Sequence, residues 1–354
     1  MAQASRAELV VRRVQVALLA LGPVAVALDR VGAAGKFTLF PLAALALIPL
    51  AWLIGEATEQ AANYTGTGIG GFLNASFGNA PELIIALVAL SDGLTDVVRA
   101  SLTGSVVGNL LLVLGFVLLV GERGTIDRTS GFVSLATILF ASLLLLVPAV
   151  PGFHGNTDRH SLAELSLPIA IALLLVRIAV NRRSLQRHRR LSAPVAPPPG
   201  AWSLRHALAV LGAATVATAF VTETLVGSLE EFAQQAHLSE FFVAIVIVAL
   251  VGNITEHGSA VLLAARGELR LAAEIGLASA AQVAGFLIPA VAILSWAIDP
   301  LALSLRPIEL ASIGSAVFVA AFALSTTRTS RPLGALLLGA YGALIVAFYF
   351  AGNR

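Results

Sequence analysis

The sequence predicts an all-α integral membrane protein with eleven transmembrane helices, ten of which form two inverted five-helix repeats. Hydrophobic residues make up 58% of the 354 residues, charged residues make up 12%, and the mean hydropathy is +0.90. This composition leaves too little polar surface to cover a water-soluble globule. Apolar segments long enough to cross a bilayer, at about 20 residues each, recur along the chain. A polar motif occurs twice, each time inside such a segment.

The predicted spans are separated by short polar connections, with one longer connection of Arg and Pro residues after the sixth. We expect the eleven spans near residues 14–31, 37–58, 69–91, 97–120, 131–151, 162–181, 203–228, 239–264, 271–297, 307–326 and 332–351. The long connection divides the chain into regions. These are an N-terminal extra helix at 1–35, a first five-helix repeat at 36–181, a basic, proline-rich cytoplasmic linker at 182–202 and a second five-helix repeat at 203–354.

The distribution of charge predicts orientation and location. Most of the 22 Lys and Arg residues fall on the side of the membrane that holds the N-terminus, so we expect a cytoplasmic N-terminus. The first apolar segment lacks a small-residue cleavage site, which favours a retained helix. The chain contains no Cys, which excludes disulfides and thiol chemistry, and this fits a prokaryotic plasma membrane. Because the basic residues lie between apolar spans, topology explains them better than nucleic-acid binding.

The repeated motif places a carboxylate at membrane depth. It reads Gly-Asn-Ala-Pro-Glu at Gly78–Glu82 and Gly-Asn-Ile-Thr-Glu at Gly252–Glu256. A charged side chain in hydrocarbon costs about 2.5–3.5 kcal/mol, so such a residue indicates a functional site. With the first helix set aside, each motif falls in the second helix of a group of five, and an odd group size inverts the second copy. Inverted repeats with sites near the midplane are typical of secondary transporters.

The motif residues supply oxygen ligands. Asn79 and Glu82 are three residues apart, as are Asn253 and Glu256, so each pair occupies neighbouring positions on one helix face. Pro81 lacks an N–H, which frees a backbone carbonyl one turn earlier and opens the helix locally. Carboxylate, carboxamide and carbonyl oxygens are the ligands that Ca²⁺ takes in proteins. We therefore predict a cation site, with Ca²⁺ as a transported substrate and no cofactor.

The helices that follow the motifs add further candidate ligands. Ser105 with Asn109, and Ser279 with Gln282, pair a hydroxyl with a carboxamide in each following span. Small neighbouring residues such as Gly104 would let these helices pack closely on the motif helices, and helix packing explains either Ser equally well. His257 follows Glu256 and has no counterpart in the first motif. It either adjusts the proton affinity of Glu256 or bonds to a neighbour.

Other acidic residues have weaker assignments. Glu59, Glu230 and Glu231 stand at the ends of predicted spans, where they either gather cations or are solvated helix ends. Six further acidic residues are expected to be ordinary exterior loop charges: Asp29, Asp92, Asp96, Asp158, Asp299 and Glu309.

Several of these stretches resemble a known family. Residues 70–86, 100–105 and 109–114 are similar to the first signature region of calcium/proton exchangers, the CAX branch of the cation/calcium exchanger superfamily. Residues 252–257 are similar to the second, and the likeness extends from about residue 50 to the C-terminus. The chain departs from the family at Ile254 and Thr255, where two alanines are usual, and its linker is basic where the family has an acidic segment.

The resemblance implies a fold of eleven helices, ten of them in two inverted halves, with one cation site built from both signature regions. Glu82 and Glu256 would bind the ion and accept protons. The supporting oxygens would come from Asn79, Asn109, Asn253 and Gln282. The departures bear on ion selectivity and on regulation by cytosolic calcium.

The leading hypothesis is Ca²⁺/H⁺ antiport by alternating access, which extrudes cytosolic calcium. A Na⁺-coupled exchanger, a monovalent cation/H⁺ exchanger and a passive cation channel are alternatives. An intramembrane hydrolase is disfavoured because the chain has no H-E-x-x-H pair and no Cys, so we expect no catalytic residue and no enzyme activity. The expected partners are Ca²⁺, H⁺ and the lipid bilayer, without nucleic acid. The sequence leaves homo-oligomer formation open.

Overall fold

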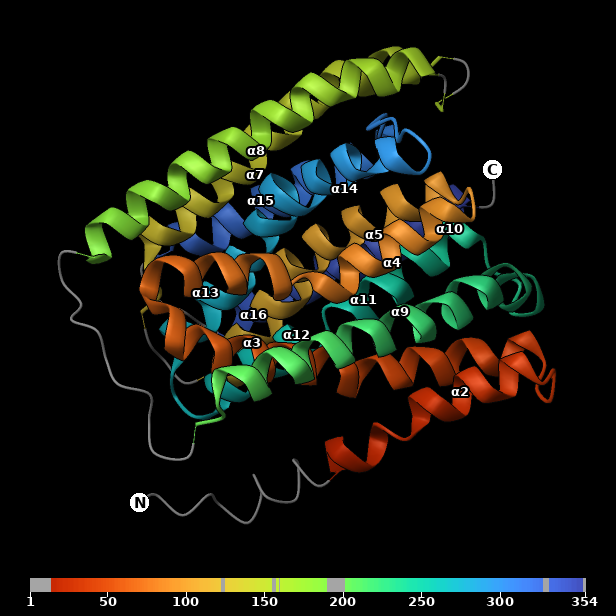
Figure 1. The fold of residues 1–354 in the computed structure, drawn as a ribbon. Helices are drawn as coiled ribbons and strands as arrows, with labels where there is room; N and C mark the ends of the chain where they lie inside the picture. The colour runs from red at the N-terminus through yellow and green to blue at the C-terminus, as the bar shows by residue number, and fades with distance from the viewer. Residues whose placement is uncertain are drawn as a thin grey trace. The chain divides into compact units, whose positions relative to one another are not determined.

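The computed structural model describes residues 14–121, 125–154, 157–158, 160–189, 201–326 and 331–352, with side chains for all of these except 65–76 and 181–189. All regular structure in these residues is helical (Figure 1), which confirms the predicted all-α class. Residues 1–13 of the predicted N-terminal helix and 190–200 of the predicted linker lie outside the described residues.

Eight helices in this part of the chain are long and apolar enough to cross a membrane. Some of them contain π-helical or 3-10 segments. The eight are α3 (Lys36–Phe77); α5, η1 and α6 together (Thr95–Val107, Gly108–Val113, Leu114–Val120); α7 (Arg128–Gly152); α8 (His160–Arg189); α9 (Leu204–Gln235); α13, η3, α14 and η4 together (Leu269–Gln282, Val283–Leu287, Ile288–Leu294, Ser295–Ala297); α15 (Pro307–Ser325); and α16 (Arg331–Gly352).

A further pair of helices would form a ninth span if counted as one. It consists of α10 (Glu240–Phe242), η2 (Val243–Val248) and α11 (Ala249–Gly252), followed by α12 (Ile254–Ala265). The axis bends by 58° at the junction between α11 and α12. This junction carries the second motif.

The described helices differ from the eleven predicted spans in two places. The predicted span at 14–31 contains α2 (Leu21–Arg30), which has 10 residues, and the span at 69–91 contains α4 (Ala80–Ser91), which has 12. The reason for the second difference is that α3 continues for 42 residues, through the predicted connection, and ends at Phe77. Pro81 is the second residue of α4 and has no N–H to bond the carbonyl of Phe77, which favours the end of α3 at this point.

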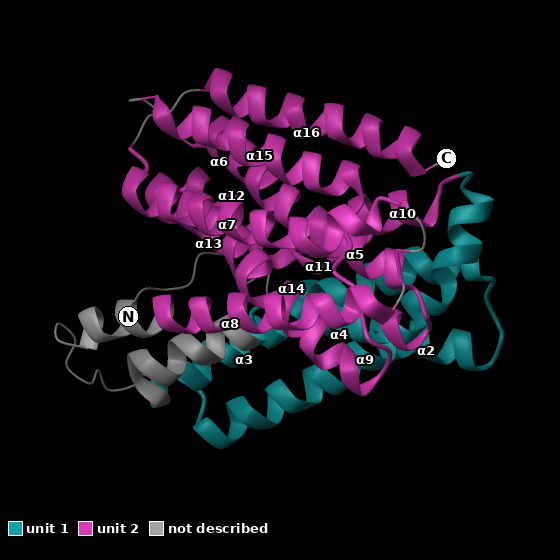
Figure 2. Cartoon of the chain, turned by 90° about the horizontal axis from the view of Figure 1, so that it is seen from above, with its two compact units in different colours: residues 1–88, 182–237 teal, residues 89–181, 238–354 magenta. Residues whose placement is uncertain are grey.

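The chain divides into two compact units, coloured separately in Figure 2. Unit 1 comprises residues 1–88 and 182–237, and unit 2 comprises residues 89–181 and 238–354. Each unit therefore contains segments from both sides of the predicted linker.

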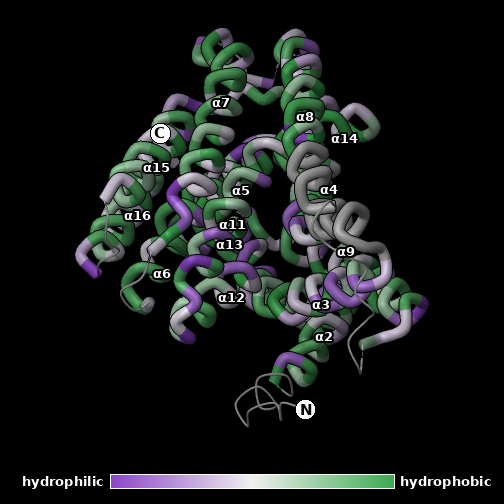
Figure 3. The backbone as a smooth tube through the Cα atoms, turned by 90° about the vertical axis from the view of Figure 1, so that its left-hand side faces the viewer, coloured by the Kyte–Doolittle hydropathy of each residue, from purple (hydrophilic) through white to green (hydrophobic). Residues whose placement is uncertain are grey.

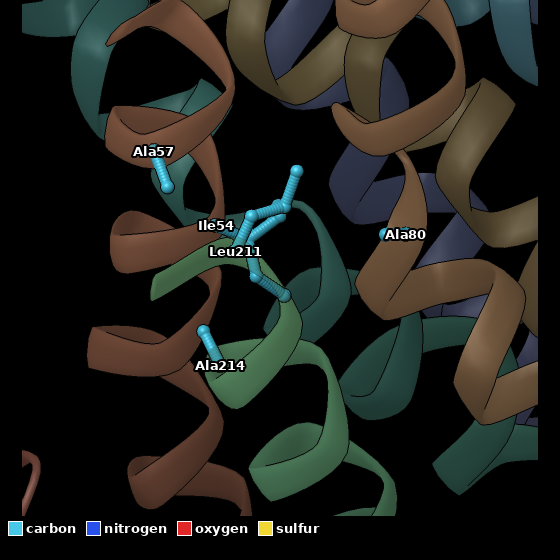
Figure 4. Close-up of a cluster of buried hydrophobic side chains, with 5 residues drawn as sticks. All are labelled: Ile54, Ala57, Ala80, Leu211 and Ala214. Carbon is cyan, nitrogen blue, oxygen red and sulfur yellow. The ribbon is translucent and has the colours of Figure 1, made fainter. Parts of the chain in front are cut away.

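In unit 1, α3 and α9 pack in antiparallel directions. Near one end, the rings of Phe40 and Phe232 stack with centroids 4.3 Å apart. Near the other, the backbone N–H of Trp202 donates to Gln60 Oε1 at 3.1 Å. Between them lies a buried apolar cluster of Ile54, Ala57, Ala80, Leu211 and Ala214, in which the side chains of Ile54 and Leu211 meet (Figure 4). Ala80 belongs to this cluster, so apolar packing positions the start of α4 beside the first motif.

In unit 2, small residues allow close backbone contact between helices. A Cβ atom added at Gly104 of α5 would overlap the carbonyl group of Ile245 in η2. A Cβ at Gly334 of α16 would come within 2.7 Å of the Gly115 carbonyl oxygen in α6. The prediction that Gly104 lets its helix pack closely on the second motif helix is therefore confirmed.

Several spans expose large apolar side chains. Figure 3 shows apolar residues along α7 and α8, and exposed examples are Leu143 on α7, Leu175 on α8 and Phe350 on α16. Large exposed apolar faces are unusual for water-soluble monomers but are the expected surface of a helix in contact with lipid. The exposure pattern agrees with the integral membrane class.

Candidate functional site

The second motif lies at the break between α11 and α12. Asn253 is the junction residue, with φ −96° and ψ 4°, and Glu256 lies in the first turn of α12. The N-terminus of a helix presents free backbone N–H groups and the positive end of its dipole, which favours an anionic side chain there. The break therefore lowers the cost of burying an ionised Glu256.

Four polar side chains on three helices form a hydrogen-bond network that ends on Glu256. Asn109 Nδ2 donates to Asn253 Oδ1 at 3.1 Å and to Ser279 Oγ at 3.0 Å. Asn253 Nδ2 donates to Ser105 Oγ at 2.8 Å and to the carbonyl oxygen of Ala249 at 2.9 Å. Ser279 Oγ donates to Glu256 Oε2. Both carboxamides are fully buried and both Ser residues are nearly so.

The structure thus brings together five of the eight predicted ligand residues within unit 2. Gln282, the sixth, is the last residue of α13 and lies three residues after Ser279. Among the described residues, no three His, Cys, Asp or Glu side chains gather as a metal cluster. Any cation bound here would take most of its ligands from hydroxyl, carboxamide and backbone oxygens, which suits a hard cation.

The first motif has the same local arrangement within unit 1. Asn79 lies between α3 and α4, its carbonyl oxygen accepts the Leu83 N–H at 3.0 Å, and Glu82 lies in the first turn of α4. Both side chains are buried, with exposed fractions of 1% for Asn79 and 6% for Glu82. In each motif, therefore, Asn stands at a helix break and Glu follows in the first turn.

Three π-helical segments adjoin the predicted residues. Asn109 is the second residue of η1, η2 precedes the break at Asn253 by one short helix, and η3 begins directly after Gln282. π-helical turns are rare in proteins, and those that occur often lie at functional sites. They leave backbone carbonyls without the usual donor four residues later. These segments were not predicted, because no residue pattern in the sequence distinguishes a π turn from an α turn.

Among the described residues, no hydrogen bond joins this network to the predicted residues His257, Glu59, Glu230 and Glu231. His257 is partly buried, and neither ring nitrogen has a hydrogen-bond partner among the described residues. Glu59 is exposed inside α3 and does not end a helix, because α3 continues to Phe77. Glu230 and Glu231 are exposed near the end of α9 and accept hydrogen bonds from Gln234 and Gln235. A role for these three Glu residues in cation entry stays a prediction.

A buried charge cluster in unit 2 was not predicted. Arg99 of α5 has an exposed fraction of 1%, and its guanidinium donates to Asp158 Oδ1 at 2.6 Å, to the Ala302 carbonyl at 3.2 Å and to Asp96. Partial burial raises the pKa of Asp158, but the hydrogen bond and charge of Arg99 outweigh this and hold it below its ordinary value. Asp96 and Asp158 are therefore not ordinary loop charges.

The cluster continues through Arg306, which pairs with Asp96 and lies 4.9 Å over the ring of Phe241. The backbone N–H of Arg306 donates to Glu309 Oε2 at 2.6 Å, and Glu309 is almost fully buried. The expectation that Glu309 is an ordinary loop charge was wrong, because Glu309 caps the first turn of α15 from inside the protein. The i, i+3 spacing of Asp96 and Arg99 was the available sequence signal for this cluster.

Comparisons with known proteins agree with the motifs. The family model described as sodium/calcium exchanger protein matches this chain twice, over residues 36–180 and 206–350. A Ca²⁺/H⁺ antiporter of Synechocystis sp. is 35% identical over 347 residues, covering 89% of this chain and 92% of that protein. The Ca²⁺/H⁺ antiporter ChaA of Bacillus subtilis is 37% identical over 326 residues, covering 88% and 92%.

Solved structures show the same relationship. The structure of native YfkE matches with a TM-score of 0.80 and 33% identity, covering 95% of this chain and 99% of that one. The crystal structure of the H⁺/Ca²⁺ exchanger CAX matches with a TM-score of 0.70 over 97% of this chain and 93% of that one; at 15% identity it supports the fold alone. The two matches of one family model, together with relatives above 30% identity along most of the chain, confirm the resemblance. This chain belongs to the sodium/calcium exchanger family.

Proposed function

We propose that this protein is a secondary transporter that exchanges Ca²⁺ for H⁺ by alternating access and extrudes calcium from the cytoplasm. The observation that carries the proposal is Glu256, held by Ser279 in the first turn of a broken helix and surrounded by buried carboxamide and hydroxyl groups. The relatives named Ca²⁺/H⁺ antiporters support it, because they match along nearly the whole chain.

Glu82 and Glu256 carry the exchange in this proposal. Both bind the divalent cation when ionised and both release it when protonated. A carboxylate pair neutralised by one divalent cation or by two protons is close to uncharged in either loaded state, so both states can be carried through the low-dielectric midplane. The empty, doubly charged state cannot, which couples calcium movement to proton movement.

The supporting oxygens belong to Asn79, Asn109, Asn253, Gln282, Ser105 and Ser279. Carboxamide and hydroxyl oxygens raise the ligand number toward the 6 to 8 that Ca²⁺ takes, without adding charge that a proton would also have to neutralise. His257 follows Glu256 on α12 and is a candidate for proton coupling.

The proposed architecture is eleven transmembrane helices, with ten in two inverted five-helix repeats, a cytoplasmic N-terminus and a location in a prokaryotic plasma membrane. Support for the repeats comes from the family model, which matches once before and once after the linker. Support for the orientation comes from the excess of basic residues on one side.

A Na⁺-coupled exchanger is the second candidate, because the matching family is described by sodium as well as calcium. A cation panel in proteoliposomes that contain a pH-sensitive dye separates the two. An inward-directed Ca²⁺ gradient should drive proton efflux without Na⁺ on either side. Calcium movement that requires an opposing Na⁺ gradient and leaves the internal pH unchanged would replace proton exchange with sodium exchange.

A further inference from the structure

We infer that Asn109 is a positioning residue for Glu256 that acts through Ser279, and that Asn253 fixes the orientation of Asn109. The inference rests on the proposed transport function, because it assigns a role to residues of the same site. It separates residues that would otherwise all count as ion ligands.

One backbone group sets the direction of the hydrogen bonds. The carbonyl oxygen of Ala249 can only accept, so the group of Asn253 that lies 2.9 Å from it is the carboxamide nitrogen. The oxygen of Asn253 therefore faces Asn109, at 3.1 Å, and Asn109 must present its nitrogen there. This assignment follows from the backbone carbonyl and does not depend on the charge of Glu256.

The same nitrogen of Asn109 has a second hydrogen, which it donates to Ser279 Oγ at 3.0 Å. Ser279 has a single hydroxyl proton. Because Asn109 approaches Ser279 as a donor, that proton cannot be given to Asn109 and is donated to Glu256. An ionised carboxylate can only accept, so the far end of the chain agrees with the assignment made at Ala249.

The carboxamide of Asn253 uses its oxygen and both N–H groups in this hydrogen-bond network. Its oxygen accepts from Asn109, and its two N–H groups donate to Ser105 and Ala249. Asn109 differs, because its oxygen is buried and has no hydrogen-bond partner among the described residues. A direct ligand role for Asn109 through that oxygen is the competing explanation, and it makes a different prediction for double variants.

Close packing holds the donor and acceptor at hydrogen-bond distance. A Cβ added at Gly276 of α13 would lie 3.3 Å from the carbonyl oxygen of Asn109, which shows how closely α13 approaches η1. The overlap that a Cβ at Gly104 would cause with Ile245 shows the same for α5 and η2. The small residues fix the helices at the separation that the Asn109–Ser279 and Asn253–Ser105 hydrogen bonds need.

A double-mutant cycle tests the inference. The apparent KM for Ca²⁺ is measured in proteoliposomes for Asn109→Leu, for Ser279→Ala and for the double variant. Each single change should raise the apparent KM roughly tenfold, because it removes or misdirects a hydrogen bond to a charged group. If Asn109 acts through Ser279, the apparent KM of the double variant should be no higher than that of the single variant with the higher KM. Multiplied effects, roughly a hundredfold rise, would show two independent ligands and overturn the inference.

Conservative variants provide a second criterion. Ser279→Thr keeps the hydroxyl donor and should stay within about threefold of the wild type. Asn109→Asp keeps an oxygen but replaces the donor nitrogen, so the Ser279 proton is diverted from Glu256 and the apparent KM should rise as in Asn109→Leu. Wild-type affinity in Asn109→Asp would support the ligand role instead. If Asn109→Leu does not fold, the Asn109→Asp measurement distinguishes the positioning role from the ligand role.

The matched control is Ser101→Ala, on the same helix as Ser105, because among the described residues the Ser101 hydroxyl bonds only the Val98 carbonyl of its own helix. It should leave the KM unchanged. The wild-type cation panel separates failure of this inference from failure of the proposed function. If the wild type carries another cation, calcium exchange is rejected and the cycle is measured with that cation. If it carries none, the cycle is measured on the cation-induced shift in melting temperature.

Discussion

The carboxylate of Asp158, in the connection between α7 and α8, accepts a 2.6 Å hydrogen bond from the guanidinium of Arg99 on α5. The Arg99 side chain is almost fully buried, whereas that of Asp158 is 39% exposed. Because Asp158 is accessible and Arg99 is buried, substituting Asp158 tests how much this ion pair contributes to the stability of unit 2.

Asp158→Ala should lower the free energy of unfolding by about 2 kcal/mol, the value of a hydrogen bond to a charged group, because Asp96 and the Ala302 carbonyl still bond to Arg99. The measurement is the melting temperature in detergent. Asp299→Ala, at an exposed position before α15, serves as the control and should melt like the wild type. Equal melting temperatures for both variants would show that the Asp158 contact contributes nothing.

The contribution of Asp158 should depend on pH. Its pKa in the folded protein is lowered, so the stabilisation is present above the ordinary Asp pKa of about 3.9 and is lost as the pH falls through the lower folded value. The difference in melting temperature between the wild type and Asp158→Ala should therefore be constant near neutral pH and shrink below about pH 4. A difference that instead grows on acidification would contradict the lowered pKa.

Gly104→Ala should reduce exchange at least tenfold, because the added methyl group overlaps the backbone of Ile245 and forces α5 away from η2. This movement would lengthen the bond between Ser105 and Asn253. Initial rates of Ca²⁺-driven proton flux give the measurement. Gly212→Ala on α9 is the matched control, since a Cβ there meets no atom of the described residues within 4 Å, and its rate should match the wild type.

Glu82→Gln and Glu256→Gln should each abolish exchange, because a carboxamide keeps the size of the side chain but neither gains a proton nor neutralises a divalent cation. Ca²⁺-dependent proton flux in vesicles provides the measurement. Near-normal flux in either variant would remove that carboxylate from the mechanism. Glu164→Gln is the control, since Glu164 is exposed near the start of α8.

Calcium should raise the melting temperature of the wild type. A ligand at 100 times its Kd stabilises the folded state by about 2.7 kcal/mol. Glu256→Gln should lose this stabilisation, whereas Asp158→Ala should keep it despite its lower starting temperature. An equal calcium shift in Glu256→Gln would place the bound ion elsewhere.

The sequence was sufficient to predict the helical class, most spans and the family, because hydropathy and the repeated Gly-Asn-x-x-Glu motif are local signals. It also placed Ser105, Asn109 and Ser279 among the candidates that the structure brings to Asn253 and Glu256. It did not reveal which group of each carboxamide donates, because that depends on a backbone carbonyl of another residue.

The wrong predictions for loop charges have one physical cause. Asp96, Asp158 and Glu309 are polar residues next to apolar spans, and sequence alone treats such positions as solvated. The structure places them around Arg99 and Arg306, with partners up to 210 positions away along the chain. Long-range ion pairing of this kind leaves little trace in a single sequence. The continuous α3 was missed for a related reason, since a helix that extends past its apolar stretch loses the hydropathy signal.

The π-helical segments let a span contain an additional residue without turning the helix that follows. Because an i→i+5 turn holds about one residue more than an α turn, removing one residue other than Asn109 from η1 would restore regular α-helical geometry and leave the rotation of α6 relative to α5 nearly unchanged. Removing one residue from the α-helical part of α5 would instead turn the residues beyond it by about 100° relative to the start of the helix, so that Gly115 would no longer face Gly334 in α16. Within this span, a one-residue deletion is therefore accommodated better in η1 than in α5.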